Sequence, residues 1–164
     1  MVRIVSLLAG LALAACSSNG TSAQETAAAP VQTAETPAVS PAGLQLIDVT
    51  IVSGETKHSF KTELAATQQE QAKGMMFRTE MGDDEGMLFP SYTPQLRSFW
   101  MKNTPLPLDI IFIGPDRRIL NIAADTPPYT EENVSSDGIT SGVLELIGGR
   151  AAELGLKPGD KVDW

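Results

Sequence analysis

Residues 95–124 read QLRSFWMKNTPLPLDIIFIGPDRRILNIAA, and this stretch contains the clearest strand signals in the chain. Apolar or alternating runs occupy residues 95–103, 109–113 and 119–124, and proline-rich or Gly-Pro-Asp breaks separate them. Short runs of this kind between turn residues are typical of β-strands. The stretch therefore predicts three successive strands joined by tight connections.

The flanking sequence continues the same pattern. Residues 44–52 and 57–63 alternate on either side of a Ser-Gly-Glu-Thr turn and predict a hairpin, and residues 143–147 and 161–164 predict two later strands. Thr67 with Glu70 three residues later predicts a capped helix ending near Gly74, and residues 151–154 predict a helical turn. No long helices separate the strands, so a parallel α/β fold is disfavoured. The prediction is a mainly β fold, a compact antiparallel β-sandwich or barrel of jelly-roll type with one or two short helices.

The first residues have the features of an export signal. Arg3 precedes an apolar run at residues 4–15, which is shorter than the ~20 residues that a membrane span needs. The run ends in Leu13-Ala14-Ala15-Cys16, which resembles the lipobox of bacterial lipoproteins, where the cysteine is lipidated and becomes the first mature residue. We therefore expect a signal peptide at 1–15, a lipidated Cys16 with a Ser-, Thr-, Ala- and Pro-rich linker at 16–43, and one domain at 44–164.

These features predict where the protein acts. A diacylated Cys16 would anchor the chain stably to a membrane, facing the periplasm. Ser17 and Ser18 follow the cysteine, and by resemblance to Gram-negative sorting rules this favours the outer membrane. Because Cys16 is the only cysteine, no disulfide and no thiol chemistry are expected in the domain.

The charge of the chain limits its partners. The formal net charge is −8, and the domain at 44–164 has 11 basic and 18 acidic residues, which gives −7. Such a surface repels phosphates and provides no counterion release on binding, so nucleic acid is not an expected partner. The expected partners are the membrane, through Cys16, and an unidentified envelope protein or glycan.

Several motifs in the domain resemble those of a known family. They are Gly74-Met75-Met76-Phe77-Arg78, Gly86-Met87-Leu88-Phe89, Phe99-Trp100-Met101-Lys102-Asn103-Thr104 with Pro107-Leu108-Asp109-Ile110, Val143-Leu144-Glu145-Leu146, and residues 155–160. Together these motifs, over residues 60–164, resemble domain-of-unknown-function family 192 of bacteria and archaea. The resemblance implies a compact jelly-roll-like β-fold and implies no established activity.

The Trp100–Asp109 segment permits two interpretations. If residues 104–107 form a loop, Lys102 faces Asp109 across a hairpin, and such a pair contributes up to ~1 kcal/mol. The pair then either locks the hairpin or forms the polar floor of a ligand site beside Trp100. The candidate ligand- or partner-binding residues are Arg78, Trp100, Lys102, Asn103, Asp109, Tyr129 and Glu145.

No catalytic residue, metal site or cofactor is predicted, and a non-catalytic binding or accessory module is the favoured function. One alternative is a small hydrolase of envelope glycan that uses carboxylates such as Asp109 and Glu145, which would have to face each other across a groove. Another is copper binding by five methionines within residues 75–101, although methionine also fills irregular cores. His58, the only histidine, lacks a suitably placed nucleophile.

Overall fold

The structure is a computed structural model, and it describes residues 38–164. The predicted signal peptide, Cys16 and the predicted linker up to residue 37 lie outside the described residues. No helix within the described part has the length and apolar character needed to cross a membrane.

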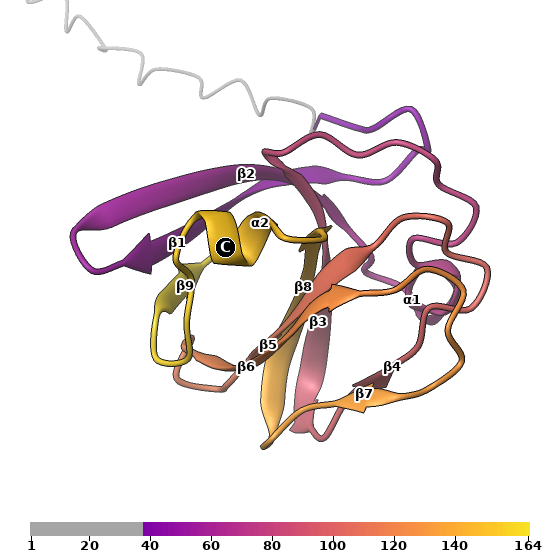
Figure 1. Ribbon diagram of the computed structural model, residues 1–164. Helices are drawn as coiled ribbons and strands as arrows, with labels where there is room; N and C mark the ends of the chain where they lie inside the picture. The colour runs from indigo at the N-terminus through magenta and orange to yellow at the C-terminus, as the bar shows by residue number, and fades with distance from the viewer. Residues whose placement is uncertain (1–37) are drawn as a thin grey trace, which may run out of the picture. The chain divides into compact units, whose positions relative to one another are not determined.

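The described chain is built mainly of β-strands (Figure 1). Its elements follow in the order β1 (Leu46–Ser53), β2 (Thr56–Leu64), α1 (Gln68–Lys73), β3 (Glu85–Gln95), β4 (Ser98–Phe99), β5 (Leu108–Ile113), β6 (Ile119–Thr126), β7 (Val134–Ser135), β8 (Thr140–Ile147), α2 (Arg150–Glu153) and β9 (Lys161–Asp163). The mainly β, sandwich-like fold with two short helices is confirmed.

Seven of the strands form one sheet in the order β6-β5-β8-β3-β2-β1-β9, and β4 and β7 form a separate small ribbon. An isolated bridge between Arg118 and Lys161 brings the two edges of the sheet together without closing it into a barrel. The sheet is mixed, because β2 and β3 are parallel while the other pairs are antiparallel. Residues 65–84, which contain α1, form the crossover that makes this parallel pair possible.

The first hairpin and the first helix follow the sequence closely. Strands β1 and β2 pair across the predicted turn, from Leu46 opposite Glu63 to Ser53 opposite Thr56. Helix α1 begins with a complete capping box, in which the Glu70 backbone N–H donates to the Thr67 hydroxyl and the Thr67 N–H donates to the Glu70 carboxylate. Such reciprocal caps satisfy backbone donors that a short helix leaves open.

The Trp100–Asp109 hairpin, by contrast, does not form. Strand β3 continues through Pro90 to Gln95, and only Ser98 and Phe99 form the following strand, which pairs with β7. Strand β5 instead lies between β6 and β8. The prediction of a strand over residues 95–103 paired with residues 109–113 is therefore wrong.

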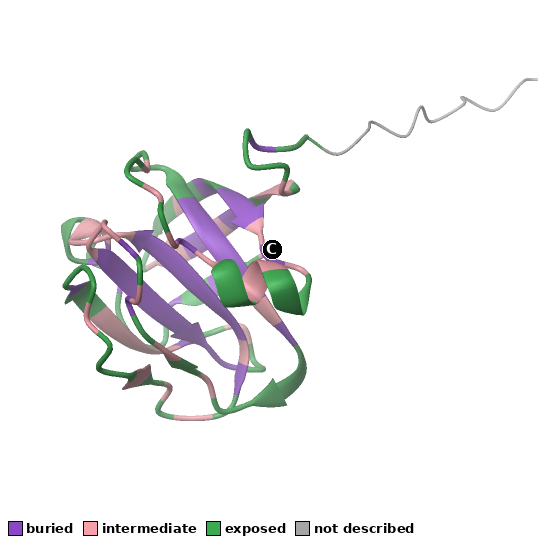
Figure 2. Ribbon diagram, turned by 90° about the vertical axis from the view of Figure 1, so that its right-hand side faces the viewer, coloured by how far each residue is buried: buried purple, intermediate pink, exposed green. Residues whose placement is uncertain are grey.

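Two apolar clusters pack on opposite faces of the sheet. All six residues of β5 are buried, which is expected of a strand covered on both sides (Figure 2). The first cluster includes Val49, Phe60, Leu88, Ile111, Leu144 and Val162. The second includes Met75, Met87, Phe89, Met101, Ile110, Phe112 and Val143. Three of the five clustered methionines are thus fully or almost fully buried core residues, as in the packing interpretation of that cluster.

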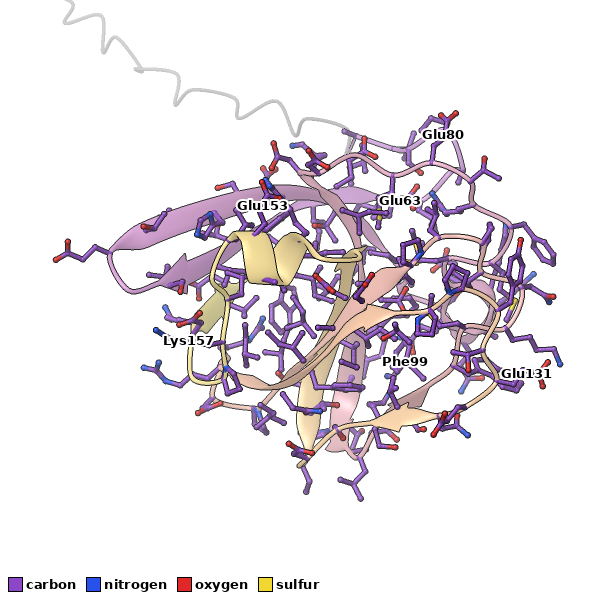
Figure 3. The ribbon with its side chains drawn as sticks, in the orientation of Figure 1. Glu63, Glu80, Phe99, Glu131, Glu153 and Lys157 are labelled. Atoms are coloured by element: carbon purple, nitrogen blue, oxygen red, sulfur yellow. The ribbon has the colours of Figure 1, made fainter. Side chains whose placement is uncertain are left out.

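The ribbon of β4 and β7 covers part of the second cluster, on the same side of the molecule as α1 (Figures 1 and 3). Phe99 of β4 lies edge-on to Phe89 and Phe112, with ring centroids 5.2 and 6.1 Å apart. These contacts hold the ribbon against the sheet. They also place the residues after β4 beside the end of α1.

Candidate functional site

Glu145 is a carboxyl group buried on the face of the sheet that carries the second apolar cluster. It lies in β8, opposite Met87 of β3 and Ile110 of β5. Only 4% of the residue is exposed, and its Oε2 atom has no hydrogen-bond partner among the described residues. A polar atom buried in this way destabilises the fold unless something else binds it.

A cavity of about 250 Å³ opens next to Glu145. Its walls come from the end of α1, from β4 and from the segment that follows β4, and they include Gln71, Arg97, Phe99, Trp100 and Lys102. Apart from Glu145, no acidic residue of the described chain lines it. The cavity therefore combines a few polar groups with aromatic walls, which is the usual composition of a small-molecule site.

Burial changes the protonation of two groups in this site. Burial raises the pKa of Glu145 to about 8, and the positive charge of Arg97 opposes this rise. The carboxyl is therefore mostly protonated at pH 7. Burial also lowers the pKa of Arg97, while the negative charge of an ionised Glu145 raises it. Buried groups with shifted pKa values in a cavity are candidates for function.

Arg97 is held in place by neutral partners. Its Nη2 donates to Oε1 of Gln71 at 3.2 Å, and its Nη1 donates to the hydroxyl of Ser91 at 3.4 Å. The guanidinium also lies 5.1 Å from the centroid of the Phe99 ring. Arg97 forms no ion pair with Glu145 within 4.0 Å, so the charge of the guanidinium remains available to a bound group.

Trp100 and Lys102 line the cavity from the segment after β4. Trp100 is 44% exposed, which is high for a large apolar side chain. The Lys102 ammonium lies 4.9 Å from the centroid of its ring, a cation–π contact. The pair therefore offers an aromatic surface and a positive charge to a ligand.

Asp109 belongs to a different environment. It is fully buried, and its Oδ1 accepts from the backbone N–H groups of Asp125 at 2.7 Å and Gly149 at 3.1 Å, while Oδ2 accepts from that of Ala151 at 2.6 Å. The predicted pairing with Lys102 is wrong, because residues 102 and 109 do not face each other in a hairpin. Asp109 instead fixes the turn that leads into α2.

The remaining candidates lie outside the cavity. Arg78 forms an ion pair with Glu63 at 2.5 Å, and both line a neighbouring hollow of about 1000 Å³, which shares Lys73 with the Glu145 cavity. Asn103 has a positive φ of 55°, and its carbonyl accepts from the Phe77 N–H at 2.7 Å. Tyr129 is exposed, and its backbone N–H donates to the Thr104 carbonyl at 3.2 Å. Of the seven candidates, the structure brings together Trp100, Lys102 and Glu145.

The sequence did not identify Arg97 and Gln71 as part of this site. Gln71 lies in α1 and Arg97 directly before β4, and neither has a fixed spacing from Glu145 in β8. Only the folded arrangement shows that they share a cavity. In residues 38–164 no group of three or more His, Cys, Asp and Glu side chains is placed to hold a metal ion.

The chain matches one protein family and resembles solved structures of uncharacterised proteins. The model of domain-of-unknown-function family 192, described as "Uncharacterized ACR", matches residues 49–164. A protein of unknown function from Novosphingobium aromaticivorans DSM 12444 is 55% identical, with a TM-score of 0.77 over 80% of this chain and 94% of its own. A second structure, from Sinorhizobium meliloti 1021, is described as a proposed transcription regulator; it is 34% identical, with a TM-score of 0.71 over 73% of this chain and 94% of its own. Curated proteins give no significant match.

Proposed function

The chain belongs to domain-of-unknown-function family 192, which supplies no activity, so we propose a function from the site itself. We propose that the protein is a lipid-anchored envelope module that binds one sugar unit of an envelope glycan in the cavity beside Glu145. The observation that carries this proposal is the buried Glu145 carboxyl, whose Oε2 has no partner in the described chain and which lines an open cavity.

The size and chemistry of the cavity support a sugar-sized ligand. A volume of about 250 Å³ corresponds to roughly eight water molecules at ~30 Å³ each. The Trp100 ring offers an apolar surface, whereas Glu145, Arg97 and the Oε1 atom of Gln71 can hydrogen-bond to hydroxyls. Aromatic rings combined with planar polar groups suit a ring that has both C–H faces and hydroxyl edges.

The hydrolase alternative requires Asp109 and Glu145 to face each other, and their positions in the sheet do not support this. Glu145 is opposite Ile110 and Asp109 is opposite Leu146, so the two acids point to opposite faces of the sheet. Two carboxyl groups that share the acid and base roles must flank one bond of the substrate. Since no second acid lines the Glu145 cavity in the described chain, binding without catalysis is the better-supported function.

The test of binding is a titration monitored by two-dimensional NMR. D-Glucose and D-glucuronate, each added separately to the purified protein, serve as probes of the sugar ring. The proposal predicts that at least one of them shifts the Trp100 indole signal and the amide signals of residues 71–76. The Trp164 indole, which packs against the first cluster, is the internal control. If neither sugar moves these signals, the proposal fails.

The lipid anchor is a separate part of the proposal and rests on the sequence around Cys16. Radioactive palmitate should label the wild-type protein in cells and should not label the Cys16→Ser variant. An uncut precursor with an unmodified thiol would contradict the anchor. It would also contradict the periplasmic location, because that location is inferred from the export signal and the acylated Cys16.

The description of the Sinorhizobium structure does not lead us to a nucleic-acid function for this chain. A domain with net charge −7 has unfavourable electrostatics for a phosphate backbone. Lys73, Arg97 and Lys102 do lie together, but they line a cavity of about 250 Å³, which is too small to admit a nucleic-acid duplex.

A further inference from the structure

We infer that the ligand of the Glu145 cavity is an acidic sugar, whose carboxylate is bound by Lys102 and Arg97 and receives a hydrogen bond from the Glu145 side chain. The inference rests on the proposed function and names the class of ligand. Three features of the site carry it: the charges around the cavity, the absence of carboxylate partners for those charges, and the surroundings of Glu145.

The cavity gathers positive charge in an acidic domain. Lys73, Arg97 and Lys102 line it, whereas the domain as a whole has a net charge of −7. None of these three cations forms an ion pair with a carboxylate among the described residues. Elsewhere in the described domain some cations are paired with acids, as Arg78 is with Glu63, whereas others, such as Lys57 and Arg118, are not. The distinctive feature of the cavity is therefore that three unpaired cations line it together. An acidic ligand would supply the missing counter-charge.

The surroundings of Glu145 favour a carboxyl that donates a hydrogen bond to the ligand rather than one that accepts. The groups opposite it on the neighbouring strands, Met87 and Ile110, are apolar, and α1 contributes the neutral Gln71 and the cation Lys73 to the cavity. Among the described residues, the other charged groups that line the cavity are Arg97 and Lys102. A protonated carboxyl in apolar surroundings donates a hydrogen bond to an anion, whereas an ionised one repels it.

This arrangement makes binding depend on pH. If the acidic sugar binds only when Glu145 is protonated, its affinity falls once the pH exceeds the pKa of about 8. The expected loss is about tenfold between pH 7 and pH 9. A neutral sugar has no charge to be repelled by the ionised Glu145, so its affinity should change little over this range.

The experiment compares D-glucuronate with D-glucose, which differ by a carboxylate in place of a hydroxymethyl group. NMR titrations at pH 7 and pH 9 give the dissociation constant of each sugar for the wild-type protein. We expect glucuronate to bind more tightly than glucose at pH 7 and to lose about tenfold in affinity at pH 9. In Glu145→Gln, whose amide donates a hydrogen bond at every pH, glucuronate should bind equally at both pH values.

A matched pair of lysine variants tests the charges. Lys102→Gln should weaken glucuronate binding by about fivefold or more, and it should weaken glucuronate binding more than glucose binding. Lys57→Gln removes an exposed lysine from β2, outside the cavity, and should change neither. Equal effects of the two variants would overturn the inference.

The outcomes separate the inference from the proposed function. If glucose binds at the cavity as tightly as glucuronate, the inference fails while the sugar-binding function stands. If glucuronate binds better but equally at pH 7 and pH 9, the donor role of Glu145 fails. If neither sugar binds to a protein whose NMR spectrum shows it to be folded, both the inference and the proposed function fail.

Discussion

Replacement of Glu145 by glutamine should stabilise the domain at neutral pH. In the unfolded chain a glutamate has a pKa near 4.5, whereas burial raises that of Glu145 to about 8 in the folded domain. Between these values the folded state binds a proton that the unfolded state has released, so stability falls as the pH rises from about 4.5 to about 8. Glutamine has nearly the same shape as the protonated glutamate and carries no charge, so the variant side chain needs no proton uptake on folding and loses no stability as the pH rises.

The size of the effect follows from the shift in pKa. A pKa difference of one unit is worth ~1.4 kcal/mol. Because Glu145 must take up a proton when the domain folds, the free energy of unfolding is lowered by about 3 kcal/mol at pH 7 and by less than about 1 kcal/mol at pH 5. Glu145→Gln should therefore raise the free energy of unfolding by these amounts at the two pH values. For a domain of this size, a change of 3 kcal/mol moves Tm by roughly 10 °C or more.

Urea denaturation of wild type and variant at pH 5, 6, 7 and 8 measures the difference directly. Glu63→Gln is unsuitable as a control because Glu63 pairs with Arg78, so Glu132→Gln, at an exposed loop position, is used instead. Equal stability of wild type and Glu145→Gln at every pH would refute the reasoning. It would mean that the carboxyl is ionised and stabilised in the folded domain.

Three further predictions concern the scaffold. Asp109→Ala should destabilise the domain by about 3 kcal/mol or more, because it leaves three backbone N–H groups without their acceptor, one of them in the buried Ala151. Asp48→Ala, which breaks an exposed ion pair, should cost about 1 kcal/mol or less, and urea denaturation compares the two variants. Phe99→Ala should lower stability by about 2 kcal/mol and release the ribbon of β4 and β7. Faster hydrogen exchange of the Ser136 amide, which donates to the Arg97 carbonyl, would report the release. Thr67→Ala should cost about 1 kcal/mol in thermal unfolding through loss of the capping box of α1, whereas Thr67→Ser should cost much less.

Local sequence rules predicted the local structure well. The β1–β2 hairpin, the capped α1 and the strand at β8 each depend on residues close together in the chain, such as Thr67 and Glu70. The errors arose where distant residues compete for the same partner. Asp109 could pair with Lys102 by spacing, but three backbone N–H groups, two of them from the turn at Gly149 and Ala151, bind it instead.

The site was predictable only in part. Trp100, Lys102 and Glu145 stand out as residue types, and the structure places all three at one cavity. That these three residues share a cavity could not be predicted from their spacing in the sequence. Glu145 lies in β8, and the position of β8 beside β3 and β5 is known only once the strand order of the sheet is known. Arg97 and Gln71 gave no signal, since an arginine before a strand and a glutamine in a helix are usually solvent-facing.

The most direct measurement is the pH titration of the Glu145 side-chain carboxyl by carbon-13 NMR, without and with glucuronate. The proposed site predicts a midpoint near pH 8 in the free protein, and a midpoint higher by about one unit when glucuronate is present at ten times its dissociation constant. A midpoint near 4.5 that does not respond to glucuronate would contradict both the protonated state of Glu145 and its part in binding.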